Sequence, residues 1–259
     1  MKDKRIIKLR SIHNLRDLGG LKNKEGKTIK RFLLLRSAAL NKVSIKDVNY
    51  LKEKYNLKSI VDLRNDQEKE EKPNINIEDL NYYHLPILNK AKLGITREEK
   101  HNIKEFAKSF PDMKQMYKDL VTDEECKANF AKALRQIINN RDGAILWHCS
   151  VGKDRCGMIS AFLLYLLDVD EKIILNDYLL SNIDVGKTAR KYYFLVLLVS
   201  KDKKTAELIR DLFVADASYF YAAINEIKEH YVSVKDYIYN ELKITKEEAN
   251  SFKEYVLYE

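Results

Sequence analysis

A cysteine and an arginine stand six positions apart in residues 145–157, as Cys149 and Arg155. Apolar runs lie on both sides, which predicts a buried strand, a loop and a helix. The backbone N–H groups of such a loop face one concavity at a helix N-terminus, where the dipole favours an anion. The same field is expected to make Cys149 a thiolate nucleophile. We therefore predict a phosphate-binding loop that carries its own nucleophile.

The chemistry expected of this loop is transfer of a phosphoryl group to sulfur. Cys149 would attack phosphorus in line, and water would hydrolyse the resulting phosphocysteine. Backbone N–H groups and the planar fork of Arg155 would hold the phosphate oxygens. No metal or cofactor is needed for this stabilisation. The predicted phosphate-binding residues are Ser150, Val151, Gly152, Lys153 and Arg155.

Three aspartates compete for the role of general acid, which protonates the leaving oxygen. Asp154 lies inside the loop beside Arg155 and is the first choice. Asp62 ends a predicted strand, at the sheet edge where open α/β folds bind ligands. It is the second choice, or a partner that orients Arg155. Asp112 is expected instead to cap the helix that starts after it.

Two other residues of the segment are open to more than one interpretation. Lys153 would be a second cation on the rim, suited to a phosphoinositide, or a general support of the thiolate. His148 is expected to hydrogen-bond nearby backbone rather than act as an acid or base.

Residues 148–157 resemble the HCxxGKDRTG signature of the bacterial tyrosine and lipid phosphatases in the family of mycobacterial protein tyrosine phosphatase B. Further matching blocks lie at residues 14–20, 36–37, 61–64, 83–86, 176–182 and 230–237. The resemblance weakens at residues 89–109 and 186–216. It implies activity on phosphotyrosine, often with phosphoserine, phosphothreonine or phosphoinositide activity as well. Residues 14–20 are expected to form a turn that braces the site.

Cys156 departs from the family pattern, in which a threonine follows the arginine. A thiol is a poorer hydrogen-bond donor than a hydroxyl, which puts the rate of intermediate breakdown in doubt. The thiol is also expected near enough to Cys149 for redox chemistry, with a neutral small-for-small replacement as the alternative.

Length and composition predict one domain over residues 1–259, with an α/β core in 1–185 and a helical part in 186–259, and the resemblance implies that it is a phosphatase domain. A charged N-terminus and three cysteines favour the cytoplasm. The longest apolar runs are too short for an integral membrane segment. The net charge of +8 comes from lysines spread along the chain, without a nucleic-acid signature. The expected partner is a phosphorylated protein or a phosphoinositide.

Alternating patterns predict an α/β fold with a mainly parallel sheet, helices on both faces and a helical C-terminal layer. From residue 173 onward only helical patterns remain. The predicted strands are residues 31–35, 59–63, 82–88 and 143–147. The predicted helices are residues 45–55, 113–121, 127–139, 158–167, 217–229 and 234–242.

The apolar segment 192–199 is open to two interpretations, a mobile lid or plain core, and core is preferred. Two other function classes also stay open. One is a non-catalytic module that binds phosphate or phosphoinositide, and the other is a rhodanese-type sulfurtransferase, which also has a cysteine at an anion-binding loop.

Overall fold

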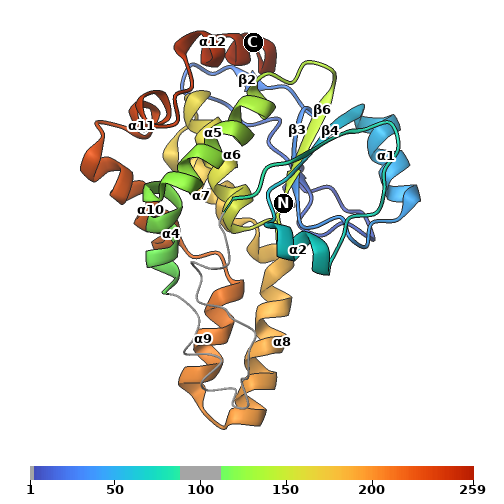
Figure 1. Ribbon diagram of the computed structural model, residues 1–259, viewed down its shortest axis with the longest axis vertical. Coiled ribbons are helices and arrows are strands. Elements are labelled where there is room, and N and C mark those ends of the chain that lie inside the picture. Colours follow the sequence, from blue (N-terminus) through green and yellow to red (C-terminus); the bar gives the residue numbers. More distant parts are fainter. Residues whose placement is uncertain (1–2, 88–111) are drawn as a thin grey trace.

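The computed structural model describes residues 3–87 and 112–259 (Figure 1). A five-stranded sheet has the order β1-β3-β6-β4-β5, and a two-stranded sheet pairs β2 with β7. Only β1 runs antiparallel to its neighbour in the larger sheet. The strands are β1 (Arg16–Asp17), β2 (Thr28–Ile29), β3 (Leu34–Ser37), β4 (Leu57–Asp62), β5 (Asn81–His84), β6 (Ala144–His148) and β7 (Leu257–Tyr258).

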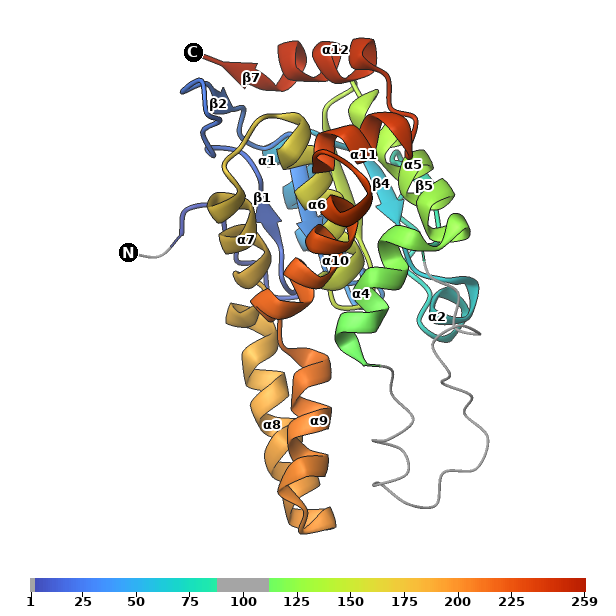
Figure 2. The same cartoon turned by 90° about the vertical axis from the view of Figure 1, so that its left-hand side faces the viewer.

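Helices lie on both faces of this sheet, as Figures 1 and 2 show. The helices are α1 (Ile45–Tyr55), α2 (Asp66–Glu71), α4 (Met113–Thr122), α5 (Glu124–Ile138), α6 (Asp154–Leu166), α7 (Glu171–Leu179), α8 (Asn182–Ser200), α9 (Lys203–Phe213), α10 (Ala217–His230), α11 (Val234–Asn240) and α12 (Lys246–Val256). The structure thus confirms the predicted α/β class and its helical C-terminal layer.

Successive side chains of the central strand β6 belong to two different core clusters. Leu146 packs with Val48 and Leu51 of α1 in one cluster, whereas Ile145 and Trp147 join the larger cluster under the other helices. Successive side chains of a strand point to opposite faces, so a fully buried strand feeds both clusters.

Register brings the carboxyl ends of three parallel strands to one edge of the sheet. His148 of β6 pairs with Ser37 of β3 on one side and with Asp62 of β4 on the other. The chain after His148 enters the predicted phosphate loop, so that loop starts in the middle of this edge. Ligands of open α/β sheets bind at such edges.

Several predicted boundaries differ from the structure for identifiable reasons. Helix α6 begins at Asp154 rather than at residue 158, because the polar end of the loop already forms its first turn. Strands β3, β4 and β6 are displaced by one to three residues from the predicted ranges. Strand β5 ends at His84, and the predicted strand's last residue lies outside the described part, as does the variable segment 89–109.

The expectation of helices alone after residue 173 is wrong at the end of the chain. Strand β7 pairs with β2, with Leu257 opposite Ile29. Ile29 is fully buried, so this short pairing closes the core where an isolated segment would fray. The boundary expected between residues 185 and 186 falls inside α8.

Helices α8 and α9 form an antiparallel hairpin that projects beyond the rest of the described structure (Figure 2). Its own small core comprises Val196, Ala206 and Ile209. Phe194, 59% exposed, and Leu198, 76% exposed, face away from it. The preferred interpretation of residues 192–199 as plain core is therefore wrong, because among the described residues α8 packs along only one side, against α9. Among the described residues, no helix is long and apolar enough to cross a membrane.

Candidate active site

The loop between β6 and α6 wraps around the sulfur of Cys149. The Gly152 N–H donates to Cys149 Sγ over 3.2 Å, which turns the amide side of the loop toward the sulfur. Gly152 has a φ of +72°, and a Cβ there would lie 2.5 Å from the Ser37 carbonyl oxygen. Glycine is required by this close approach to the backbone of β3, and not only by the approach of a ligand.

Buried side chains hold the loop from behind by its carbonyl oxygens. The Asn14 side-chain amide donates to the carbonyls of Val151, over 3.1 Å, and Gly152, over 3.0 Å. Arg36 Nη2 donates to the carbonyls of Gly152 and Lys153, over 2.9 and 3.2 Å. Because the carbonyls are bound behind the loop, its N–H groups are presented on the Cys149 side. The predicted bracing of the site by residues 14–20 is confirmed for Asn14.

A buried ion cluster stands behind these contacts. Asp177 of α7 accepts from Arg5, over 2.7 Å, and from Arg36, over 3.0 Å. Arg16 donates to the Asp177 backbone carbonyl over 2.9 Å and to the side chain of Asn14. Arg5 is also paired with Asp3 over 2.8 Å, so three guanidinium groups and two carboxylates leave a net positive charge behind the phosphate loop. That charge favours an anion in front of it.

Cys149 and Cys156 are buried neighbours with free thiols. A hydrogen bond from the Cys156 thiol and the charge of Arg155 lower the pKa of Cys149 to about 6, against the effect of burial. Burial and the adjacent sulfur raise the pKa of Cys156. The pair therefore has one thiolate, at Cys149, and one donor, at Cys156. The thiol takes the position of the threonine expected from the family pattern, and its sulfur also lies 3.8 Å from the Ser37 carbonyl oxygen and 3.9 Å from the Trp147 carbonyl oxygen.

Arg155 is held in place by Glu68 of α2. Its Nη1 and Nη2 groups donate to the two Glu68 oxygens over 2.6 and 2.9 Å, and Nη1 also reaches the carbonyls of Leu63 and Ile87. Although burial opposes ionisation, hydrogen bonds from Arg155 hold the pKa of Glu68 at about 2. Among the described contacts, these bonds use the Nη1–Nη2 end of the guanidinium, which leaves its Nε–Nη2 edge for two phosphate oxygens.

Sequence reasoning did not identify Glu68. The same carboxylate closes a capping box with Asn65 and accepts from Ser150 Oγ over 2.5 Å. The spacing of Asn65 and Glu68 is a capping-box signal, and it could have placed a helix start beside the sheet edge. Nothing in the spacing indicates that Glu68 also binds Arg155, 87 residues later in the chain.

Asp62 lies at the predicted edge of the sheet, but its carboxylate binds residues other than Arg155. Its carboxylate accepts from Arg64 over 2.7 Å, from the Tyr82 hydroxyl over 2.8 Å and from Asn74 over 3.2 Å. Although burial opposes ionisation, the hydrogen bonds from Arg64 hold the pKa of Asp62 at about 2. Among the described residues, the carboxylate that binds Arg155 is Glu68, and the Asp62 side chain is fully buried.

His148 joins this network to the loop. Its Nδ1 lies 3.4 Å from the Cys149 carbonyl oxygen and its Nε2 lies 3.0 Å from the Asn74 amide nitrogen. Burial lowers the pKa of His148 to about 4. The imidazole is thus neutral near pH 7, with Nδ1 as donor and Nε2 as acceptor. The predicted bond between His148 and nearby backbone is confirmed.

Asp154 is the most accessible carboxylate of the loop region, with 26% of its side chain exposed. It opens α6 and accepts a hydrogen bond from the Tyr117 hydroxyl of α4. Tyr117 in turn lies 2.8 Å from the Tyr178 hydroxyl. Asp112 accepts from the Lys114 N–H over 2.8 Å, so its predicted role as a helix cap is confirmed.

Lys153 is buried and points toward the hairpin. Its Nζ donates to the carbonyls of Leu212, over 2.7 Å, and Val214, over 3.0 Å, at the end of α9. It also lies 3.4 Å from Asp154 Oδ1. The expectation of a free rim cation is therefore wrong in this conformation, because the helix-end carbonyls occupy the ammonium.

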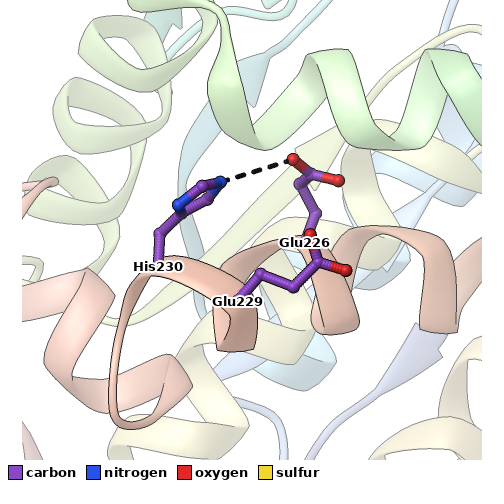
Figure 3. A group of neighbouring side chains, drawn as sticks. All are labelled: Glu226, Glu229 and His230. Carbon is purple, nitrogen blue, oxygen red and sulfur yellow. Dashed lines mark ion pairs between the residues drawn. The ribbon is translucent and has the colours of Figure 1, made fainter.

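A separate group of possible metal ligands lies on α10 (Figure 3). Glu226 is bound by Lys118 of α4 over 2.7 Å, and its other oxygen lies 3.7 Å from His230 Nε2. Glu229 is exposed beside them. Because Glu226 is already paired with Lys118, we interpret this group as an ion-pair cluster outside the active site.

Comparison with known proteins agrees with this geometry. A family model described as "Tyrosine phosphatase family" matches residues 7–258. A tyrosine-protein phosphatase of Nostoc commune is 28% identical over 122 residues, which are 47% of this chain. The aligned region is 39% of that relative's length.

The solved structures that match this chain resemble it only distantly. The crystal structure of P. aeruginosa TpbA is 16% identical, covers 76% of this chain and 90% of its own, and gives a TM-score of 0.36. The structure of the Siw14 catalytic core is 17% identical, covers 86% of this chain and 96% of its own, and gives a TM-score of 0.38. We draw no mechanistic argument from these scores.

Proposed function

The chain belongs to the tyrosine phosphatase family, and we propose that it hydrolyses phosphomonoesters, phosphotyrosine in proteins above all, through a phosphocysteine at Cys149. The observation that carries the proposal is the hydrogen bond that Cys149 Sγ accepts from the Gly152 N–H, inside a loop closed by Arg155. The motif resemblance to the family of mycobacterial protein tyrosine phosphatase B supports dual-specificity or phosphoinositide activity as an extension.

The first step needs a bound phosphate in line with sulfur. The loop N–H groups from Ser150 to Lys153 and the Nε–Nη2 edge of Arg155 bind the three equatorial oxygens. Cys149 attacks phosphorus, the P–O bond to the leaving group breaks, and the phosphoryl group stays on sulfur. Water then attacks phosphorus and releases inorganic phosphate and the thiolate. Glu68 is a positioning residue, because it acts through Arg155.

Asp154 is our proposed general acid, and Asp62 is a structural carboxylate. Asp154 is partly exposed beside the loop, whereas Asp62 is fully buried and bound by Arg64. A carboxylate held at a pKa of about 2 does not carry the proton that a leaving oxygen needs near neutral pH. The Tyr117 hydroxyl, which donates to Asp154, orients that carboxylate.

We extend the proposal to the rest of the chain as follows. Residues 1–259 act as one phosphatase domain, because one core cluster joins Leu18, Trp147 and Val256. Three cysteines that form no disulfide support the cytoplasm as the compartment. The mechanism requires no cofactor or nucleic acid, and its partner is the phosphorylated substrate.

Release of inorganic phosphate from an aryl phosphate, with and without a chelator, tests the proposal. We expect chelator-resistant release that Cys149→Ser abolishes. Cyanide-dependent formation of thiocyanate would instead identify a sulfurtransferase, and tight phosphate binding without turnover would identify a binding module.

A leaving-group series tests the assignment of the acid. Asp154→Asn should slow alkyl phosphates far more than activated aryl phosphates, because only poor leaving groups need the proton. Equal loss across the series would assign Asp154 to structure. Asp62→Asn, made in parallel, should lower the unfolding temperature and show no such dependence.

A further inference from the structure

The outer side of α8 exposes a row of large apolar side chains. Phe194, Leu195 and Leu198 are 59%, 49% and 76% exposed. Their spacing of one, three and four residues places them on one face of the helix. Val185 and Val196, about half a helical turn away, are buried. The apolar row therefore lies opposite the side that packs on the rest of the protein.

Cations share this face and surround its apolar part. Lys187, Arg190 and Lys191 are exposed and precede Phe194 at helical spacing. The turn after α8 adds the exposed Lys201, Lys203 and Lys204. We use "outer α8 face" for Lys187, Arg190, Lys191, Phe194, Leu195 and Leu198. The hairpin from Asn182 to Phe213 holds seven Lys or Arg and four Asp or Glu, so it is net positive.

The hairpin that presents this face is fixed at its root. The Asn182 side chain donates to the Ala215 carbonyl over 2.7 Å and accepts from the Ala215 N–H over 2.8 Å. Lys153 of the phosphate loop binds the carbonyls at the end of α9. The face is therefore already ordered, and binding to it does not require folding of the hairpin.

We propose that the outer α8 face docks on an anionic membrane surface. Hydrocarbon and the headgroup boundary would accept Phe194, Leu195 and Leu198, while lipid phosphates would bind the adjacent cations. The cores of protein–protein interfaces are depleted of lysine, so a row with cations at both ends fits a bilayer better than a protein partner. The long lysine stems let the ammonium groups reach the headgroups while the apolar side chains insert.

Vesicle co-sedimentation with the full chain tests this docking. The wild type should bind vesicles of phosphatidylcholine mixed with phosphatidylserine and not vesicles of phosphatidylcholine alone. Phe194→Asp with Leu198→Asp should weaken binding at least about tenfold, since both apolar anchors are lost. Turnover of a soluble aryl phosphate should be unchanged. Val232→Asp is the matched control, because Val232 is 96% exposed between α10 and α11.

A second variant keeps the apolar row and removes charge. Lys187→Gln with Lys191→Gln should weaken binding about thirtyfold and reduce its dependence on salt, at about 1 kcal/mol per cation near the surface. Cys149→Ser should bind vesicles like the wild type, which separates docking from the proposed catalysis. Equal binding by the wild type and the double aspartate variant would overturn the proposal. A dimer that this variant dissociates, without vesicle binding, would assign the face to a second copy.

Discussion

The phosphate loop and the α8–α9 hairpin are built on opposite principles. Each carbonyl from Val151 to Lys153 is bound by a buried side chain, and Arg155 is held by the half-buried carboxylate of Glu68. The hairpin has a small core of its own and leaves an apolar face exposed. Removing one partner of a buried ion pair costs about 3–5 kcal/mol, whereas most surface changes cost within about 0.5 kcal/mol. Changes in the loop should therefore affect catalysis, and changes on the outer α8 face should affect only the proposed binding to membranes.

The two regions meet at one side chain. Lys153 belongs to the loop by sequence and to the hairpin root by its hydrogen bonds. The phosphate loop and the hairpin are therefore in contact, and they differ in the kind of side chain that each presents. The loop holds polar groups for a transition state, and the hairpin presents a surface.

The largest effects are expected at the ends of the loop. Cys149→Ser and Arg155→Ala should each lower turnover by about a thousandfold or more, because they remove the nucleophile and the clamp on the phosphate. Steady-state kinetics with an aryl phosphate measures this. Leu198→Asp on the hairpin is the matched variant and should keep turnover. Substantial activity in Cys149→Ser would contradict the cysteine mechanism.

The second largest effect on turnover is expected for Glu68, which positions Arg155. Glu68→Gln should lower kcat by about a hundredfold, because a small misplacement of Arg155 is costly to the transition state. Glu70→Gln on the same helix, with an exposed side chain, is the control. Thermal unfolding of both variants separates positioning from stability. If kcat fell only in proportion to the folded fraction, Glu68 would be structural.

A smaller effect is expected in the pH profile. Cys149 must be ionised to attack, and its pKa is about 6, so kcat/KM for an activated aryl phosphate, which needs no general acid, should rise with pH through about 6 and then level off. Cys156→Ala removes a hydrogen bond to the thiolate and should move this rise to higher pH. Cys156→Ser keeps a hydrogen-bond donor, so kcat/KM should rise at nearly the same pH as in the wild type. Alkylation of Cys149 by iodoacetamide gives an independent titration. Superimposable profiles for all three proteins would refute the role of Cys156.

The smallest effect is expected where the two regions join. Lys153→Met should increase hydrogen exchange of residues 201–214 by about tenfold, because charge-assisted hydrogen bonds to the helix end are worth about 1.5–3 kcal/mol. Lys204→Met at the hairpin turn is the control. Unchanged exchange in Lys153→Met would show that the root is held by Asn182 and packing alone.

The loop itself was predictable from sequence because its determinants are local. Cys149, Gly152 and Arg155 lie within seven residues, and the apolar runs on either side indicate the strand and helix that carry them. The α/β class followed from similar local periodicity. Strand ends were displaced because hydrogen-bond pairing with neighbouring strands, rather than apolar pattern, decides where a strand stops.

The partners of the site residues depended on tertiary structure. Glu68 was not identified, Asp62 was expected nearer to Arg155, and Lys153 was expected at the rim. Each side chain has several acceptors or donors of suitable charge along the chain, so spacing alone does not select among them. Packing of α2 and α9 against the loop makes the selection.

The sequence by itself thus determined the nucleophile, the phosphate loop and the type of sheet, since these arise from neighbours in the chain. Only the tertiary structure decided that Glu68 holds Arg155 and that Lys153 ties the loop to α9. It also decided that Leu198 is exposed, although its apolar neighbours indicated core. Periodicity shows which face of a helix is apolar, but burial requires a second surface, and the described part of the chain provides one for only one side of α8.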